Sequence, residues 1–237
     1  MSTTTTAPKR RTWWSRRIRL QFSLRTMLLA MLLSGPVTFG WLAYIRPYQR
    51  DQAVAQHVTD LKGSHGFETQ GPSWLISLLG EERFQRLVWI RLKGQEINDE
   101  DIRFVSGASQ LRSLTLSKMR DISDASMVSI GTLKELTTLT ISSRQITSWG
   151  LAELLPLKKL RVLKLYNLQL QGEGLAPLAS FKELEELTLW CRSVKLKDSG
   201  LRYLAGHQRL KLLEMRNLTL RGKGVKRFQS DRREDAP

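Results

Sequence analysis

Residues 160–165 read Leu-Arg-Val-Leu-Lys-Leu, and this spacing of aliphatic residues occurs five times between positions 111 and 215. The other copies begin at Leu111, Leu136, Leu184 and Leu210, so the copies restart after 25, 24, 24 and 26 residues. A weaker copy at 87–92 precedes them. A nearly constant period of this length indicates a tandem structural repeat rather than a generally leucine-rich composition.

Each unit continues past this motif in a regular way. An apolar residue lies about ten positions after each motif begins, and a small residue followed by an apolar one comes next, as in Gly150-Leu151, Gly174-Leu175, Gly200-Leu201 and Gly224-Val225. In the first two units Asp101 and Ser126 replace the glycine. We predict one short parallel strand per unit and a returning helix that starts near the small residue, in six units. Because no unit buries its own apolar side, stacked neighbours must form the core.

This pattern resembles the leucine-rich-repeat family, in particular short bacterial units whose returning half reads T-D-x-G-L-x-x-L. Residues 198–204 fit that motif well and residues 148–154 fit it more loosely. The resemblance covers about residues 87–228. It implies an α/β solenoid, a right-handed coil of about six units of 24–26 residues with the parallel strands on the concave face. Only Asn167 and Cys191 lie near the position of the family's asparagine ladder, so a continuous ladder is absent.

Residues 26–45 carry no charge and, as a helix, reach roughly the 30 Å thickness of a hydrocarbon core. We predict a single transmembrane helix there. The preceding residues 1–25 hold seven basic residues and no acidic one, which places the N-terminus in the cytoplasm. A cleaved signal peptide is the alternative. The apolar stretch is of spanning length and no A-x-A-like site follows it, which favours a retained anchor.

The anchor and the repeats divide the chain further. We predict a linker over 46–71, an N-terminal cap helix over 72–86, the repeat domain over 87–228 and a flexible tail over 229–237. The run 71–84, together with residues 22–26, resembles bacterial membrane-anchored leucine-rich-repeat proteins of uncharacterised function. That resemblance implies a single-pass protein of the bacterial inner membrane, with the repeats on the periplasmic or extracytoplasmic side, and it implies no activity.

Composition and single residues argue against several classes of function. The net charge is +16, but 31 basic and 22 acidic residues are interspersed after position 45 and no nucleic-acid-binding motif occurs, so we expect no nucleic-acid partner. His57, His65 and His207 show no metal-ligand spacing and are expected to be surface residues. No G-x-S-x-G elbow, phosphate loop or dinucleotide-binding glycine motif occurs, and the adjacent pairs Glu81-Glu82 and Glu185-Glu186 point in different directions and cannot flank a substrate. We therefore expect no enzyme activity and no cofactor. Cys191, the sole cysteine, is either a structural thiol or the site of an intermolecular disulfide.

The outward positions of the predicted strands are the best candidates for a binding site. They are Trp89, Arg91, Thr115, Thr138, Thr140, Lys164, Tyr166, Glu186, Trp190, Glu214 and Arg216. Tyr166, Trp190 and Arg216 occupy equivalent positions in successive units and form an aromatic column. Tyr, Trp and Arg are frequent at binding hot spots. The alternative interpretation is that the column packs on itself, with cation–π support from Arg216.

We therefore predict a membrane-anchored, non-catalytic protein-interaction module. A second hypothesis is a structural envelope component that binds cell-wall or glycan polymer through its basic and aromatic repeat surface. A third, a cytosolic adaptor, requires that residues 26–45 do not span a membrane.

Overall fold

The computed structural model describes residues 46–168, 171–172, 174–196 and 202–218. Within these residues the strands form one sheet with β1, β2, β3, β4, β5, β7 and β8 side by side, and the short β6 beside the end of β7. All the neighbouring pairs are parallel except β1 and β2, which are antiparallel. The strands are β1 (Ser64–Thr69), β2 (Gln85–Lys93), β3 (Ser113–Ser117), β4 (Thr138–Ser142), β5 (Val162–Leu168), β6 (Gln171–Gly172), β7 (Glu186–Leu196) and β8 (Leu212–Leu218).

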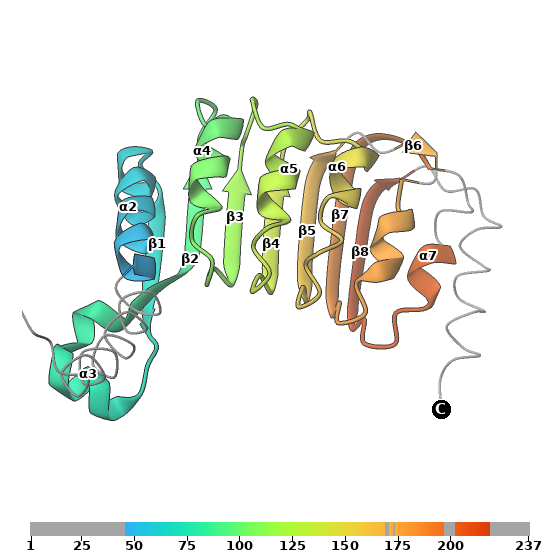
Figure 1. The fold of residues 1–237 in the computed structure, drawn as a ribbon. Coiled ribbons are helices and arrows are strands. Elements are labelled where there is room, and N and C mark those ends of the chain that lie inside the picture. The colour runs from blue at the N-terminus through green and yellow to red at the C-terminus, as the bar shows by residue number, and fades with distance from the viewer. Residues whose placement is uncertain (1–45, 169–170, 173, 197–201, 219–237) are drawn as a thin grey trace, which may run out of the picture. The chain divides into compact units, whose positions relative to one another are not determined.

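Short helices return the chain from one parallel strand to the next, and they lie on one face of the sheet (Figure 1). They are α4 (Asp99–Val105), α5 (Asp124–Ile130), α6 (Ser148–Ala152), the 3-10 turn η3 (Ala176–Ser180) and α7 (Arg202–Ala205). Two further helices, α2 (Arg46–Asp60) and α3 (Ser73–Leu79), precede the repeats, and the 3-10 turn η2 (Glu81–Phe84) leads into β2. The opposite face of the sheet is not covered by these helices, and we call it the open face.

The register of the sheet confirms the predicted repeat. Leu114, Leu139, Leu163 and Leu187 occupy matching positions in successive strands, and each is fully buried. Burying such a side chain is worth roughly 1.5–3 kcal/mol. Each unit thus presents its leucines to its neighbours, and one continuous core runs through the stack.

The aliphatic side chains of the last described strand are less buried than those of the earlier strands. Leu213 and Met215 of β8, equivalent to fully buried leucines in earlier strands, are only partly buried. Strand β8 is the last strand that the structure describes, so no later described unit covers its side chains. The returning half of the sixth unit, with Gly224 and Val225, lies outside the described residues.

Residues 46–71 do not form the linker that the sequence led us to expect. They form α2 and β1, and Val54, Ala55 and Val58 of α2 are buried in the core of the repeats. The prediction failed because Val54, Val58 and Leu61, although at helical spacing, lie outside the leucine motif and next to several glycines. Helix α2 packs against α4 in place of a preceding repeat helix, and His57 Nε2 lies 3.0 Å from Asp101 Oδ1.

The predicted cap helix over 72–86 is present only in part and does not cover the first repeat. Within it only Ser73–Leu79 are α-helical, Gln85 and Arg86 belong to β2, and Trp74 and Leu78 are largely exposed. The first repeat is covered instead by α2 and by β1, which pairs along β2 from Ser64↔Arg91 to Thr69↔Gln85. A buried Asp51 carboxylate on α2 accepts a hydrogen bond from the Leu87 amide at 3.3 Å and fixes α2 to the start of β2.

Aspartates at the first position of the repeat helices connect neighbouring units. Asp99 accepts hydrogen bonds from the amide and hydroxyl of Ser123 at 2.9 and 2.6 Å, and Asp124 accepts from the amide and hydroxyl of Thr147 at 2.9 and 2.6 Å. Ser123 and Thr147 are themselves the N-caps of α5 and α6. These bonds form a polar ladder on the helix side of the stack, away from the usual asparagine position.

The same ladder explains why the small residue of the motif is glycine in one unit and serine in another. At Gly150 an added Cβ would lie 2.2 Å from Asp124 Oδ1, so a side chain fits there only if the Asp124 carboxylate moves. At the equivalent position Ser126 is fully buried, and its hydroxyl donates to Asp99. Gly150 therefore makes room for the aspartate of the preceding unit, and Ser126 binds that aspartate.

Gly150→Ala should destabilise the protein, although alanine in a helix is ordinarily favoured over glycine by about 1 kcal/mol. The added methyl group would displace the Asp124 carboxylate and weaken its bonds to Thr147, and we expect a loss of about 1–3 kcal/mol. Urea unfolding followed by circular dichroism measures the change. Ala152→Gly, at the end of the same helix, is the control for propensity alone. A Gly150→Ala variant more stable than the parent would contradict this account of the ladder.

Asp99 should make stability depend on pH. Burial opposes ionisation of its carboxyl, but hydrogen bonds from Ser123 and Ser126 outweigh burial and hold the pKa below the ordinary aspartate value. A carboxyl with a lowered folded-state pKa stabilises the fold above the unfolded value, about pH 3.9, and this contribution disappears as the pH falls through the folded-state pKa. The stability difference between the parent and Asp99→Asn should therefore shrink below about pH 4. Unfolding free energies measured from pH 7 to pH 2.5 test this, and a constant difference would contradict it.

Among the described residues no helix is both long enough and apolar enough to cross a membrane. The basic tail 1–25, the apolar segment 26–45 and the tail 229–237 lie outside the described residues.

Candidate functional site

The predicted site residues lie in three rows across the open face, one residue from each strand per row. The first row contains Trp89, Ser113, Thr138, Val162, Glu186 and Leu212; the second Arg91, Thr115, Thr140, Lys164, Thr188 and Glu214; the third Lys93, Ser117, Ser142, Tyr166, Trp190 and Arg216. The rows follow from strand alternation, since every second residue of a strand points to the same side. The parallel register then aligns equivalent residues of successive units.

The three side chains of the aromatic column, Tyr166, Trp190 and Arg216, pack against one another within the third row. The rings of Tyr166 and Trp190 meet edge to face, with centroids 5.3 Å apart and an interplanar angle of 88°. The Arg216 guanidinium carbon lies 4.6 Å from the centroid of the Trp190 ring. The contacts of the packing interpretation are thus present, yet 37% of the Trp190 surface remains exposed. The column is therefore a preorganised group of three side chains that still offers part of the Trp190 surface and the exposed Arg216 side chain to a partner.

The charged candidates beside the column are paired with one another. Lys164 Nζ lies 3.3 Å from Glu186 Oε2, and Arg216 Nε donates to Glu214 Oε1 at 2.8 Å. These pairs are partly exposed and each contributes little to stability. The two ion pairs hold Lys164 and Arg216 beside Tyr166 and Trp190. Each positive charge in this part of the face is thus matched by a glutamate.

The threonines beside the column on the open face are buried or half-buried. Thr188 points outward in the register but is only 3% exposed. The hydroxyl-bearing Thr115, Thr138 and Thr140 of the preceding strands are half-buried and shorter than the residues of the column. The face thus changes from small hydroxyls on β3 and β4 to large aromatic and charged groups on β5, β7 and β8.

Trp89 and Arg91 lie at the other end of the rows from the column. Strand β2 is separated from β7 by three strands, and at about 4.8 Å per strand step the two ends are roughly 20 Å apart. Trp89 packs over Gly66 of β1, where an added Cβ would lie 2.1 Å from its indole Nε1. The structure therefore joins Lys164, Tyr166, Glu186, Trp190, Glu214 and Arg216 into one cluster and leaves Trp89 and Arg91 apart from it.

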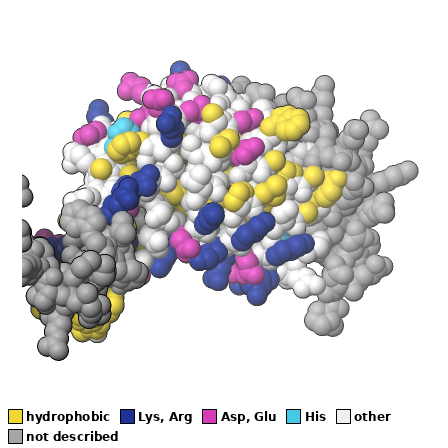
Figure 2. Space-filling model, in the orientation of Figure 1, with side chains coloured by type: hydrophobic (Ala, Val, Ile, Leu, Met, Phe, Trp, Pro, Cys, Tyr) yellow, Lys and Arg dark blue, Asp and Glu magenta, His cyan; other side chains and the backbone are white. Residues whose placement is uncertain are grey.

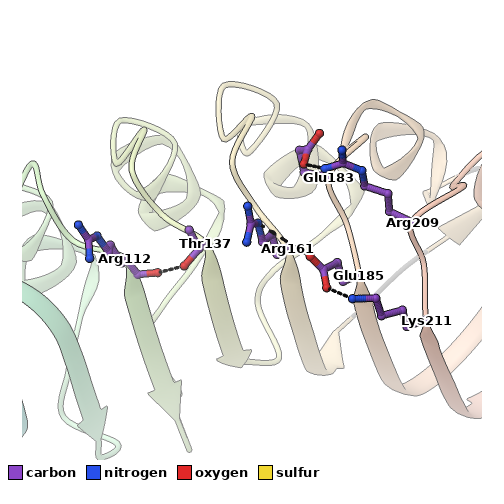
Figure 3. A network of polar contacts seen from close by, with 7 residues as sticks. All are labelled: Arg112, Thr137, Arg161, Glu183, Glu185, Arg209 and Lys211. Carbon is purple, nitrogen blue, oxygen red and sulfur yellow. Dashed lines mark hydrogen bonds and ion pairs between the residues drawn. The ribbon is translucent and has the colours of Figure 1, made fainter.

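A chain of charges borders the face where the strands begin (Figure 3). Glu185 Oε2 accepts from Lys211 Nζ at 2.6 Å, and its other oxygen lies 3.9 Å from Arg161 Nε. The hydrogen bond from Lys211, together with its charge, holds the pKa of Glu185 below the ordinary value. Glu183 pairs with Arg209 beside it. Much of the basic charge at this edge is thus paired with neighbouring glutamates, which weakens a purely electrostatic mode of binding.

The helix side carries a different surface. Figure 2 shows hydrophobic side chains gathered around α6 and basic side chains along the edge where the strands begin. Trp149 at the start of α6 is 82% exposed and Val128 on α5 is 53% exposed. Neither residue is among the predicted site residues. Trp149 provides a matched comparison for Trp190, because both are exposed tryptophans on opposite faces.

His207 is not the surface residue that the sequence suggested. It is 3% exposed, its Nε2 lies 2.9 Å from the Leu178 carbonyl oxygen, and its Nδ1 lies 3.2 Å from the Leu204 carbonyl oxygen. The imidazole bridges η3 and α7 and has a structural role. Cys191 lies in β7, but its side chain is outside the described part of the structure. Among the described side chains, no group of three His, Cys, Asp or Glu residues could hold a metal ion.

A parallel sheet built from one L-x-x-L-x-L strand per 24–26 residues, with a short return helix on one face, identifies the architecture. This is the leucine-rich-repeat fold. Neither protein-family comparison nor comparison with curated proteins gives a match. The leucine-rich-repeat ectodomain of the receptor kinase SOBIR1 from Arabidopsis thaliana is similar in structure, with 15% identity, a TM-score of 0.47, and coverage of 73% of this chain and 95% of that one.

The plant peptide hormone receptor RGFR1, solved in complex with RGF2, is similar over a shorter range. It has 17% identity and a TM-score of 0.33, and the match covers 53% of this chain and 23% of the receptor chain. Both likenesses concern the repeat architecture alone. The leucine-rich-repeat core of this chain is established by its own register and burial.

Proposed function

We propose that this protein is a non-catalytic protein-interaction module whose docking site is the open face around the aromatic column. The observation that carries the proposal is the cluster of Tyr166, Trp190 and Arg216, which is aligned across three strands, with Trp190 and Arg216 exposed and Tyr166 half-buried. Ordered aromatic and arginine side chains lose little conformational freedom on binding, which is why they dominate binding energy at interfaces. The paired charges around them would confer specificity.

The proposal includes a single-pass anchor formed by residues 26–45 in a bacterial inner membrane, with the N-terminus in the cytoplasm and the repeats outside it. Its support is the uncharged stretch of spanning length and the seven basic residues before it. Reporter fusions at both termini test the topology. Activity of a cytoplasmic reporter at the N-terminus and of a periplasmic reporter at the C-terminus is expected. Cytoplasmic activity at both ends would favour the adaptor hypothesis instead.

Replacing both Tyr166 and Trp190 with alanine should abolish partner capture by the full-length protein. Truncating one hot-spot residue typically costs about 2 kcal/mol, or about thirtyfold in affinity, and two together should remove detectable binding. The measurement is quantitative co-purification of a stoichiometric protein after crosslinking in native cells. Trp149→Ala, which removes an exposed tryptophan from the helix face, should leave capture unchanged. Equal capture by the parent, by the Tyr166→Ala/Trp190→Ala double variant and by Trp149→Ala would refute the proposed site.

A second candidate function is the binding of cell-wall or glycan polymer, favoured by the partly exposed Trp190 ring beside Tyr166 and Arg216. This hypothesis predicts that the full-length protein is retained by an insoluble wall fraction and is released by salt. A stoichiometric protein partner that resists the same salt supports the first proposal. The Tyr166→Ala and Trp190→Ala pair is needed in both assays, because both hypotheses use the same rings.

A further inference from the structure

Helix α3 projects from the cap on a narrow neck. Strand β1 ends at Thr69, paired with Gln85, and the Gln70 amide donates to the Phe84 carbonyl at 2.9 Å. Between these neck residues the chain forms α3 and η2, which lie beyond the end of the sheet and away from the repeat helices (Figure 1). The segment is thus attached to the domain at one end, and among its described side chains only Phe84, at the neck, is buried.

The exposed side of α3 is apolar. Residues 70–80 carry no charge, and Trp74 and Leu78, four residues apart and therefore on one helix face, are 68% and 72% exposed. Ser73 and Ser77 lie on another face, where the Ser77 hydroxyl donates to the Ser73 carbonyl. A tryptophan and a leucine side by side on an uncharged protruding helix are suited to the boundary between headgroups and acyl chains.

The topology places α3 at the end of the domain where the chain enters it. Helix α2 starts at Arg46, runs to Asp60 and turns at 61–63 into β1, which runs back in the opposite direction. Fifteen helical residues and six strand residues both span about 20 Å, so Arg46 and Thr69 lie at the same end. The Asp51 bond to the Leu87 amide independently holds the start of α2 beside the start of β2. The uncharged segment 26–45 ends directly before Arg46.

We propose that α3 is a second membrane contact, in which Trp74 and Leu78 enter the interface of the bilayer spanned by residues 26–45. This inference rests on the anchor of the proposed function. Arg46 follows that segment without a spacer in the sequence, so the proposed anchor joins the domain at the end that carries α3. Exposed Glu81, Glu82 and Arg83 follow the helix, and two carboxylates against one guanidinium give this turn no excess of positive charge. Glu81 also accepts a hydrogen bond from Thr69 at 2.9 Å. The contact is therefore apolar rather than electrostatic. It should therefore persist at high salt and on zwitterionic lipid.

The test uses the full-length chain with Cys191→Ser, reconstituted into phosphatidylcholine vesicles. An environment-sensitive dye is attached through Leu78→Cys on α3, through Ala125→Cys on the exposed side of α5, or through Leu33→Cys in the apolar segment. Nitroxide-labelled lipid then reports contact with the bilayer. We expect blue-shifted, lipid-quenched emission from positions 33 and 78, water-like emission from position 125, and no change in 1 M salt. Trp74→Ser should reduce the quenching at position 78.

Three other outcomes would each overturn the proposal, and the emission at positions 33 and 78 distinguishes them. Quenching at position 33 with water-like emission at position 78 would remove the α3 contact and leave the anchor intact. Water-like emission at position 33 would remove the anchor and with it the basis for this inference. A blue shift at position 78 without lipid quenching would show that α3 contacts protein, such as a second copy of the chain, instead of lipid.

Discussion

Leu139→Ala is expected to lower the free energy of unfolding by about 2–5 kcal/mol, because it leaves a cavity in a close-packed interior. Leu139 lies in β4 between Leu114 and Leu163 and has no exposed surface. Neighbouring strands on both sides are fixed by the same register and have little freedom to close the cavity. Urea unfolding of the full-length protein in detergent, followed by circular dichroism, measures the loss.

Thr140→Ala is the matched control for this core substitution. Thr140 is the next residue of the same strand but lies on the open face, half-buried. A change within about 1 kcal/mol is expected there. Comparable losses at positions 139 and 140 would contradict the assignment of alternate residues to core and open face.

Val58→Asp should also have a large effect. It is expected to lower the free energy of unfolding by about 4 kcal/mol or more, because it would place an unpaired carboxylate in the core. Val58 is fully buried where α2 covers the first repeat. If α2 is an integral cap, its disruption exposes Leu87, Ile90 and Leu92 of β2. Thermal unfolding and exposure of apolar surface to a hydrophobic dye measure the effect.

Ala53→Asp on the exposed side of α2 is the control for the charge itself. Its stability should remain close to that of the parent, since the carboxylate stays in water. If Val58→Asp were equally harmless, α2 would be the linker that the sequence analysis predicted and the cap would have to be sought elsewhere.

The sequence predicted the repeats well because one physical requirement recurs five or six times. Leucines at matching positions must face the neighbouring unit, so the period alone sets the strands, their parallel order and the side each residue faces. The alignment of Tyr166, Trp190 and Arg216 in one row follows from that register and is confirmed. Their role in binding stays a prediction, because it depends on a partner.

The features that sequence reasoning missed are made by contacts between units or by single elements. Helix α2 occurs once, so no repetition marked it as part of the core. His207 reaches the Leu178 carbonyl, 29 positions earlier, which no local pattern encodes. The polar ladder was visible in the sequence. Ser123-Asp124 matches the Thr-Asp pair that begins the T-D-x-G-L-x-x-L motif, and Thr147 occupies the threonine position one unit later. The ion pairs of the open face, Lys164 with Glu186 and Arg216 with Glu214, could be assigned only from the positions of their side chains.

The most direct test of the account is photo-crosslinking in native cells from position 190 on the open face and from position 149 on the helix face. Both positions hold exposed tryptophans, so a crosslinking amino acid of similar size replaces each without disturbing the leucine core. We predict one discrete protein adduct from position 190 and none from position 149. Adducts from position 149 alone would contradict the central claim that stacking of the leucines leaves the opposite sheet face as the docking surface.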